Sequence, residues 1–555
     1  MRRTRSPRTG ARHGLAVLMA LVAATACAPA GVAVRTPSVT ASGRSTGSGM
    51  TRSSATSLPP DLGGLTTASC QPDLRRGWLS RENRHVGIAV ATPSTDPSAT
   101  VYLDTGSATC GQVVHAAVSG PHGSYSLRVV RVGWYGGSGG RVVAATPPFR
   151  GGPQLDGPRT GDAGTPGWQS SASVRVGPSW PPGLYLVQLM ARGLAVQAAP
   201  LVVRAPDGAL RSPALFVVPA MTWAAYTRFG GRSLYRDARL PGRAGVAHRA
   251  RTADVARPIE GPGVYAVYRY TVPTVSAVEH AGVDVDYAAD LDVDATPSLV
   301  RGRGELVTGS HTEYVSRRVY DAFQAARDAG TNLAFLGANG FYWQARVTRD
   351  PQLRPLAITV HRQLAGDPVA ATSPSQATVR WRDAPLNRPE AQLLGGQYNG
   401  LGVVAPLVVL TAPDWLGWTA GQILPAGYAS EVDHAVNGIS PPDTQVLAAG
   451  AALKDGTEVD AMTTYYVAAS GAAVFDAGSV FAGCSTTNSC QAIPIPAPTG
   501  RFWSTTIVHV VRAFASSRFG ADHPRSRPAA QWPTYRDLVR RYGRSVAGTS
   551  IAARD

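Results

Sequence analysis

The sequence predicts two domains of different class, an antiparallel β-sandwich followed by a doubly wound α/β domain. Between about residues 67 and 207, short runs of alternating apolar residues are separated by glycine and proline turns, without helical stretches. From about residue 212 to 518, apolar strands alternate with helical segments, which favours a parallel sheet covered on both faces. A chain of 555 residues with 44% hydrophobic content is long enough to bury both cores.

The first 27 residues resemble an export signal. Basic residues 1–14 precede an apolar run from Leu15 to Ala26, which is too short to span a bilayer. The run ends at Cys27 in a pattern similar to a bacterial lipoprotein cleavage site. We therefore expect either a lipoprotein on the outer face of the cell membrane or a secreted protein. Residues 28–66 are rich in Ser, Thr, Gly and Pro and predict a flexible tether.

Four further cysteines suit an oxidising compartment. Cys484 and Cys490 could close a short loop, and Cys70 with Cys110 would staple the first domain. A zinc site is the alternative use of four cysteines, but the sequence contains no C-x-x-C pair.

The net charge of +17 does not predict a nucleic-acid partner. Nearly all of the positive charge is arginine, with Lys454 the only lysine, and the arginines are scattered along the chain. No basic run is interleaved with aromatic residues, as a nucleic-acid groove would require. A coding bias toward arginine and alanine is the simpler explanation of this charge, and attraction to an anionic envelope surface is the alternative.

The first domain is expected to be an immunoglobulin-like antiparallel sandwich. Its alternating apolar runs predict strands at 85–91, 125–134, 171–176 and 184–189. Two motifs within it are distinctive: RVGWYGGSGGR, which begins at Arg131, and WPPGLY, which begins at Trp180.

The most informative stretch runs from Glu305 to Arg346. Residues 305–310 predict a buried strand, a helix follows with Ser316 as its N-cap, and residues 332–336 predict a second strand. Gly330 suits the position just past the helix C-terminus. Such a strand–helix–strand unit makes the two strands parallel neighbours in one sheet.

Further elements extend the second domain on both sides of this unit. The sequence predicts helices at 273–281 and 505–515, and strands at 214–219, 283–287, 403–410, 446–451, 463–468 and 473–477. Residues 519–555 form a polar C-terminal tail.

Polar side chains cluster where the two strands of the central unit end. His311 and Glu313 follow the first strand, and Asn339 follows the second. Ligands bind at the carboxyl edge of an open α/β sheet, so we expect the functional site there. The simpler reading stays open: His311 and Glu313 could hydrogen-bond the next helix, and Asn339 with Gly340 could form only a turn.

Seven segments carry a resemblance to a known family: RVGWYGGSGGR, WPPGLYLVQL, TWAAYTRFGGRSLY, VDVDYAADLD, GSHTEYVSRRVYDAF, NLAFLGANGFYWQARV and YYVAASGAAVFDAGSVF. In these segments the chain is similar to the large (beta) subunit family of N,N-dimethylformamidase, in particular the group that shares its C-terminal domain. The resemblance implies a β-sandwich packed on an α/β domain similar to class I glutamine amidotransferases.

The resemblance also implies a mononuclear iron held by two tyrosines and a glutamate. Glu313 would be the carboxylate ligand, with Tyr226 in TWAAY and Tyr185 in GLY as the phenolates. His311 and Asn339 would be the histidine and asparagine close to the metal.

The chemistry of this set fits metal-assisted amide hydrolysis. Carboxylate and phenolate are hard anionic donors that suit Fe³⁺ better than zinc or copper. Three protein ligands leave room for a water and a substrate carbonyl. His311 could orient the substrate or move a proton, and Asn339 could donate to an oxyanion. Glu431 or Asp433, in the segment SEVDH, could supply a general base.

Structural alternatives exist for both tyrosines, because Tyr185 could simply pack in the sandwich and Tyr226 could be an ordinary residue at the rim of the sheet. The turn 308–311 lacks the cysteine that an amidotransferase nucleophile requires, and GGSGGR does not open a helix as a phosphate-binding loop would.

Two functions therefore remain as hypotheses. One is an exported iron-dependent hydrolase of small amides or related C–N bonds; the other is a non-catalytic binding or scaffold protein of the cell envelope. Neither the oligomeric state nor a small-subunit partner follows from the sequence.

Overall fold

The computed structural model describes residues 66–157, 162–309, 311–487, 490, 494–524, 532–543 and 547–550. The expected export signal, Cys27 and all but the last residue of the expected tether lie outside this part of the chain. Within it, no helix is both long enough and apolar enough to cross a membrane.

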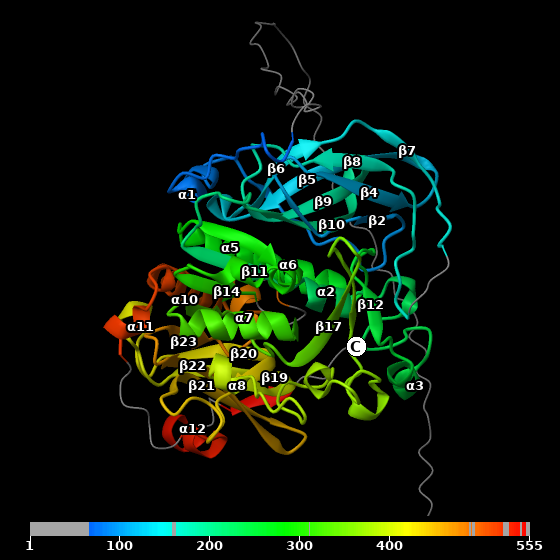
Figure 1. The fold of residues 1–555 in the computed structure, drawn as a ribbon. Helices are drawn as coiled ribbons and strands as arrows, with labels where there is room; N and C mark the ends of the chain where they lie inside the picture. The colour runs from blue at the N-terminus through cyan, green and yellow to red at the C-terminus, as the bar shows by residue number, and fades with distance from the viewer. Residues whose placement is uncertain are drawn as a thin grey trace, which may run out of the picture. The chain divides into compact units, whose positions relative to one another are not determined.

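The N-terminal part forms two sheets over one apolar core (Figure 1, blue to cyan). The larger sheet has the order β1-β6-β5-β9-β10-β3, with β7 paired to β5, and the smaller one has the order β2-β4-β8. Their pairings are antiparallel except β10 with β3. The strands are β1 Ile88–Ala89, β2 Thr100–Leu103, β3 Ser107–Thr109, β4 Val113–Ser119, β5 Gly123–Val132, β6 Gly139–Ala145, β7 Phe149–Gly151, β8 Ala172–Arg175, β9 Gly183–Ala191 and β10 Leu194–Arg204.

The alternation of apolar and polar residues in the sequence explains this core. Val101 on β2 and Val114 on β4 face Val129 on β5 and Val187 on β9, and all four are buried. The predicted strands are present with shifted ends; the first of them shortens to two residues, β1.

Ten strands of the described chain form the sheet of the second part. Its order is β13-β11-β14-β16-β23-β22-β21-β24-β19-β20. The strands are β11 Ala214–Val218, β13 Val285–Ala289, β14 Glu305–Thr308, β16 Asn332–Phe335, β19 Gln397–Val409, β20 Ile423–His434, β21 Gln445–Lys454, β22 Thr457–Val467, β23 Ala473–Asp476 and β24 Ala547–Ser550.

The expectation of a parallel sheet holds for the first five strands of this order, β13 to β23. From β22 onward neighbouring strands pair antiparallel, apart from the short parallel contact of β24 with β21. The apolar runs in this half are buried on both faces and therefore resemble parallel strands in sequence. The C-terminal tail, for which no strand was expected, supplies β24.

Helices cover the parallel half. Within this sheet the chain goes from β11 to β13 on one side of β11, and it then crosses back to β14 and β16 on the other side. Right-handed crossovers therefore place α5 (Val272–His280) on one face and α6 (Asp290–Ala295) and α7 (Arg317–Asp328) on the opposite face. The long helix α10 (Ala497–Phe514) packs against α5, and α6 packs against α7 (Figure 1).

The central strand–helix–strand unit forms as predicted. The Ser316 side chain accepts a hydrogen bond from the Val319 backbone N–H and so caps α7. Gly330 follows the helix with a φ of 98°, a conformation that glycine adopts without strain. β14 and β16 pair in parallel, with Glu305 opposite Asn332.

The remaining elements are short. β12 Thr252–Asp254, β18 Pro355–Thr359, β17 Trp343–Arg349 and β15 Tyr314–Ser316 form a four-stranded sheet beside the main one. The other helices are α1 Trp78–Glu82, α2 Ala220–Tyr226, α3 Gly242–Ala247, α4 Pro262–Tyr265, α8 Ala391–Leu394, α9 Phe481–Cys484, α11 Phe519–Asp522 and α12 Tyr535–Tyr542, together with a π-helix at Ala266–Thr271.

Both expected disulfides form, Cys70–Cys110 in the first part and Cys484–Cys490 in the second. The zinc alternative for the four cysteines is therefore excluded, because all four are paired with one another.

A buried ion pair joins the two parts of the protein. Arg131 on β5 and Glu279 on α5 are both fully buried, and their Nη2 and Oε1 atoms lie 2.7 Å apart. Arg131 also donates to the Pro182 carbonyl at 2.9 Å and to the Tyr135 hydroxyl at 3.0 Å. The Tyr287 hydroxyl donates to Glu279 at 2.8 Å. The two distinctive sandwich motifs thus serve this contact, since Arg131 and Tyr135 belong to one and Pro182 to the other.

We predict that Arg131→Met destabilises the protein by about 3–5 kcal/mol, because it leaves the Glu279 carboxylate buried without its cation. Urea unfolding followed by tryptophan fluorescence measures the change. Arg75→Met is the control, since Arg75 pairs with Asp73 on the exposed surface and its loss should leave the midpoint unchanged. Equal midpoints for the two variants would contradict this account.

Candidate active site

The strand order fixes where a site can form. β11 is followed along the chain by β13 on one side, and β14 then lies on its other side. In such sheets ligands bind beyond the carboxyl ends of the strands where the order reverses, here between β11 and β14. Helix α2 begins directly after β11 and ends at Tyr226, and His311 and Glu313 follow β14. The topology therefore brings these three residues to one place.

Three oxygen atoms converge there. The Tyr226 hydroxyl donates to Oε2 of Glu313 at 2.8 Å. The Tyr235 hydroxyl contacts the same carboxylate oxygen and lies 2.9 Å from the Tyr226 hydroxyl. The two phenol rings pack with their centroids 4.4 Å apart. Tyr235, in the loop between α2 and α3, is a site residue that the sequence reading did not single out, although it ends the segment TWAAYTRFGGRSLY.

His311, Asn339 and Glu431 form the second half of the cluster. Nε2 of His311 lies 2.9 Å from Oε2 of Glu431 and 3.7 Å from Oε2 of Glu313. The Asn339 side-chain amide donates to the same Glu431 oxygen at 2.7 Å. Five of the six expected site residues, all except Tyr185, are therefore brought together, and Glu431 joins them through His311.

Glu431 reaches the site through the end of β20, a strand on the far edge of the sheet. Val432 forms a bridge with Ser479, just beyond β23, and the Val480 N–H donates to the Glu431 carbonyl at 3.2 Å. The last residues of β20 thus lie over the carboxyl end of β23. Sequence patterns predict strands but not this crossing of one edge over the sheet.

The loop after β16 holds Asn339 in an unusual backbone conformation. Its φ is 52°, in the left-handed region that asparagine tolerates better than most residues. Its backbone N–H donates to Oδ1 of Asp433 at 2.8 Å, which fixes the turn. The Asn339 Oδ1 atom is buried and has no hydrogen-bond partner among the described residues. The expected turn and the expected functional side chain are thus both present at this position.

Burial and neighbouring charges set the protonation of the cluster. Both tyrosines keep some exposure, yet burial and the charge of Glu313 raise the pKa of Tyr226 and Tyr235 well above the usual value. Burial lowers the pKa of His311, but the charges of Glu431 and Glu313 outweigh it and raise this pKa to about 9. The phenols are therefore neutral donors, and His311 carries a positive charge that faces Glu431.

Arg362 closes the cluster on the side of Tyr235. Its guanidinium carbon lies 4.4 Å from the centre of the Tyr235 ring and 4.9 Å from that of Trp343. It also hydrogen-bonds the hydroxyl of Tyr314, the residue after Glu313. A cation over the phenol face favours the ionised form of Tyr235 and orients its ring.

Tyr185 lies elsewhere. It is fully buried on β9 in the sandwich core, where its ring stacks on Trp180 with centroids 5.3 Å apart. Its hydroxyl donates to the Pro181 carbonyl at 2.7 Å. The structure thus shows the packing alternative for Tyr185, and the second phenol beside Glu313 is that of Tyr235.

The family described as N,N-dimethylformamidase beta subunit-like, C-terminal, matches residues 126–491, which is well over half of the chain. The chain belongs to this N,N-dimethylformamidase beta subunit-like family. The matched range includes every residue of the cluster. No curated protein matches the chain.

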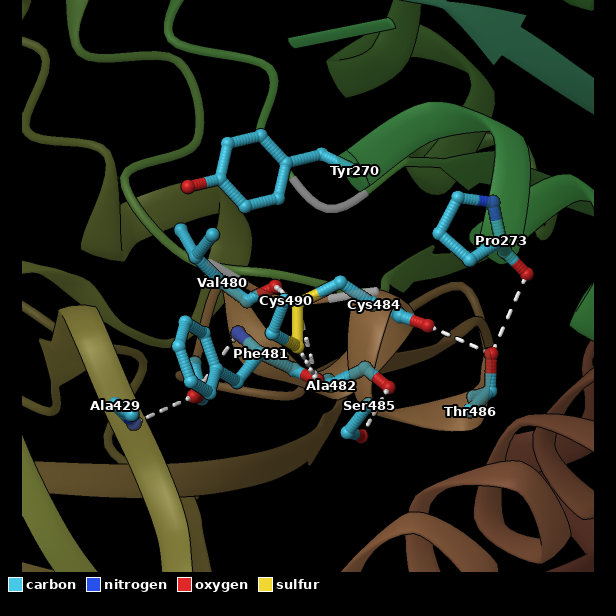
Figure 2. Close-up of a disulfide and its surroundings, with 12 residues drawn as sticks. Tyr270, Pro273, Ala429, Val480, Phe481, Ala482, Cys484, Ser485, Thr486 and Cys490 are labelled. Carbon is cyan, nitrogen blue, oxygen red and sulfur yellow. Dashed lines mark hydrogen bonds between the residues drawn. A yellow bond between two sulfur atoms is a disulfide. The ribbon is translucent and has the colours of Figure 1, made fainter. Parts of the chain in front are cut away.

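A buried apolar cluster contains the second disulfide (Figure 2), and its residue Tyr270 contacts the site. Tyr270, Val480, Cys484 and Cys490 pack together, and Thr486 donates to the Pro273 carbonyl at 3.4 Å. The Tyr270 ring meets the His311 ring edge-on, with centroids 6.1 Å apart.

The residues of this family member fit a hard cation. No group of three His, Cys, Asp or Glu side chains in the described chain is arranged to hold a metal ion. The hydroxyl oxygens of Tyr226 and Tyr235 nevertheless lie within hydrogen-bond distance of one Glu313 carboxylate oxygen and of each other. A site of one carboxylate and two phenol oxygens suits a trivalent cation that can displace both phenol protons. A separate cavity of about 500 Å³, lined by Leu103, Arg204 and Trp223, includes none of these residues.

We predict that Asn339→Gly is more stable than Asn339→Ala by about 1 kcal/mol, because only glycine adopts a positive φ without strain. Both variants lose the same side-chain amide, so the difference between their stabilities reports the strain of the backbone at this position. Thermal unfolding of the two proteins measures it. Equal stability would show that the loop changes its conformation when the side chain is removed.

Proposed function

We propose that this protein is an exported, iron-dependent hydrolase of small amides or related C–N bonds. One observation carries the proposal: two phenol oxygens and the Glu313 carboxylate meet beside a His311–Glu431 pair. Membership of the N,N-dimethylformamidase beta subunit-like family supports an amide as the substrate class. Two disulfides support an oxidising compartment and hence export, as a lipoprotein anchored at Cys27 or as a secreted protein.

Tyr226, Tyr235 and Glu313 would hold the metal. Bound Fe³⁺ would supply a water of lowered pKa and would polarise the amide carbonyl. Burial and the charge of Glu313 keep both phenols protonated, so metal binding has to release two phenol protons. The charge of Arg362, which lies over the Tyr235 ring, acts to lower the pKa of that phenol and so makes its proton easier to remove.

His311 and Glu431 would handle protons. Nε2 of His311 carries a proton toward Glu431, within 2.9 Å. A departing amine nitrogen requires such a proton, and Glu431 can accept one from an attacking water and return it to His311. Because His311 is buried and the Glu431 side chain is only 14% exposed, bulk water has little access to a proton that moves between them.

Asn339 would orient the substrate. One of its two side-chain N–H groups donates to Glu431, and the other could donate to an oxyanion. Its Oδ1 is the buried acceptor without a partner. An amide substrate carries an N–H that this oxygen can accept, so Asn339 would select primary and secondary amides over tertiary ones.

We predict that Tyr235→Phe loses iron and its visible colour, because a ferric ion bound by phenolate absorbs visible light and the variant removes one ligand. Tyr185→Phe is the matched control: it also removes a tyrosine hydroxyl, but one that donates to Pro181, so it should retain both metal and colour. Metal analysis and a visible spectrum of each purified protein decide between the two sites.

The opposite result, iron lost in Tyr185→Phe and retained in Tyr235→Phe, would refute the proposed ligand set. A wild-type protein that takes up no iron on reconstitution would favour the alternative of a non-catalytic envelope binding or scaffold protein.

We predict that Glu431→Gln lowers kcat/KM for small formamides and acetamides by about 100-fold and leaves the iron content unchanged. The reason is that Glu431 contacts His311 and Asn339 but not the proposed ligand oxygens. Steady-state kinetics with parallel metal analysis test this separation. Iron loss in this variant would place Glu431 among the metal ligands instead.

A further inference from the structure

A second pair of carboxyl groups lies beneath the candidate site. Asp433, near the end of β20, and Asp476, the last residue of β23, are both fully buried. They line the same cavity of about 10 Å³, together with Thr308 at the end of β14 and Gly337 after β16. The cavity has room for no more than about one water molecule.

Each aspartate uses only one of its two oxygens. Oδ1 of Asp433 accepts the Asn339 N–H at 2.8 Å, and Oδ1 of Asp476 accepts the Gly478 N–H at 3.2 Å. Both Oδ2 atoms are buried and have no hydrogen-bond partner in the described part of the chain. A carboxyl group in this situation is unfavourable as an anion, and two of them are more so.

Among the described residues, no arginine, lysine or histidine forms an ion pair with either aspartate. The charge of Arg382 lowers the pKa of Asp433, but its guanidinium is bound to the Glu390 carboxylate by three hydrogen bonds of 3.0–3.2 Å. The positive charge of His311 faces Glu431. A proton can neutralise the two carboxyl groups that line this cavity.

We propose that Asp433 and Asp476 share one proton across this cavity, and that Asp476 is thereby a positioning residue that acts through Asp433 on Asn339. A hydrogen bond between the two Oδ2 atoms satisfies both unpartnered oxygens at once. It also leaves Oδ1 of Asp433 free to hold the Asn339 backbone. The shared proton stands without the proposed function, whereas its effect on catalysis rests on that function.

The electrostatic surroundings support the shared proton. Burial and the charges of Glu390 and Glu431 raise the pKa of Asp433 to about 7, although the hydrogen bond from the Asn339 backbone and the charge of Arg382 lower it. Burial and the charge of Asp433 raise the pKa of Asp476 well above the usual value. When the pair loses its proton, repulsion between two buried anions strains the contact of Asp433 with Asn339. The amide that holds Glu431 would then shift.

The first test is the dependence of stability on pH. A carboxyl group whose pKa is raised by folding stabilises the protein fully below its ordinary pKa, and this contribution is lost as the pH rises through the folded pKa. The wild-type Tm should therefore fall by about 2–4 °C between pH 5 and pH 8 relative to Asp476→Asn. The variant replaces the shared proton with a permanent amide N–H. Equal pH dependence of the two proteins would overturn the proposal.

An infrared titration detects the shared proton directly, without unfolding the protein. The carbonyl stretch of a protonated carboxyl group should be present at pH 6 and weaken as the pH rises through 7, and Asp476→Asn should lack this band. A titrating band that persists unchanged in Asp476→Asn would assign the proton elsewhere and refute the shared pair.

The positioning role is tested by the pH profile of amide hydrolysis. Asp476→Asn should retain kcat/KM above pH 7, where the wild type declines, and Asp476→Ala, which has no donor, should lose about 10-fold at every pH. Glu305→Gln is the control, since Glu305 is another buried carboxyl with raised pKa, but at the opposite end of β14. It should alter the pH dependence of Tm and leave the activity profile unchanged.

Asp476→Asn losing as much activity as Asp476→Ala would refute the positioning role. If the wild type hydrolyses no amide, the proposed function fails, while the thermal and infrared measurements still decide whether the proton is shared.

Discussion

The burial of negative charge is the constraint on which the candidate site depends. Glu313, Glu431, Asp433 and Asp476 are all largely removed from water near the carboxyl ends of the parallel strands. Each is compensated differently: Glu313 by two phenol hydroxyls, Glu431 by His311, and the aspartates by backbone N–H groups. Such an arrangement is costly for stability and gains nothing for packing, so its presence favours a functional explanation. A trivalent cation in place of the phenol protons would relieve the largest part of this cost.

The backbone makes this concentration of charge achievable. The strand order reverses at β11, which separates the turns after β11 and β14 enough to leave space between them. The turn after β16 supplies Asn339 only because its φ is positive, and Asp433 holds that conformation through one hydrogen bond. The end of β20 contributes Glu431 by lying across the end of β23. The strand order, the turn after β16 and the crossing of the end of β20 over β23 therefore determine the site together.

Local sequence patterns were enough to predict part of the fold and of the site. The strand–helix–strand unit, the Ser316 cap, Gly330 and the Cys484–Cys490 disulfide follow from the sequence, because each depends on residues close together in the chain. The Cys70–Cys110 disulfide followed instead from the even number of cysteines. The antiparallel half of the sheet did not follow, since strands buried on both faces look alike in either orientation. Tyr235 was missed for a different reason. It lies in an irregular loop, and only the fold shows that this loop passes over Glu313.

The β-sandwich is part of the site's support, although it contributes no residue to the cluster. Arg131 on β5 fixes Glu279 on α5 in a fully buried ion pair. The π-helix that runs directly into α5 carries Tyr270, whose ring lies against His311 and packs on the cluster around the second disulfide. One continuous helical segment thus connects the domain contact to the proton-carrying histidine. The distinctive motif RVGWYGG therefore has a structural role, because its Arg131 holds that segment. A loss of Arg131 would therefore reach His311 through the backbone rather than through any shared ligand.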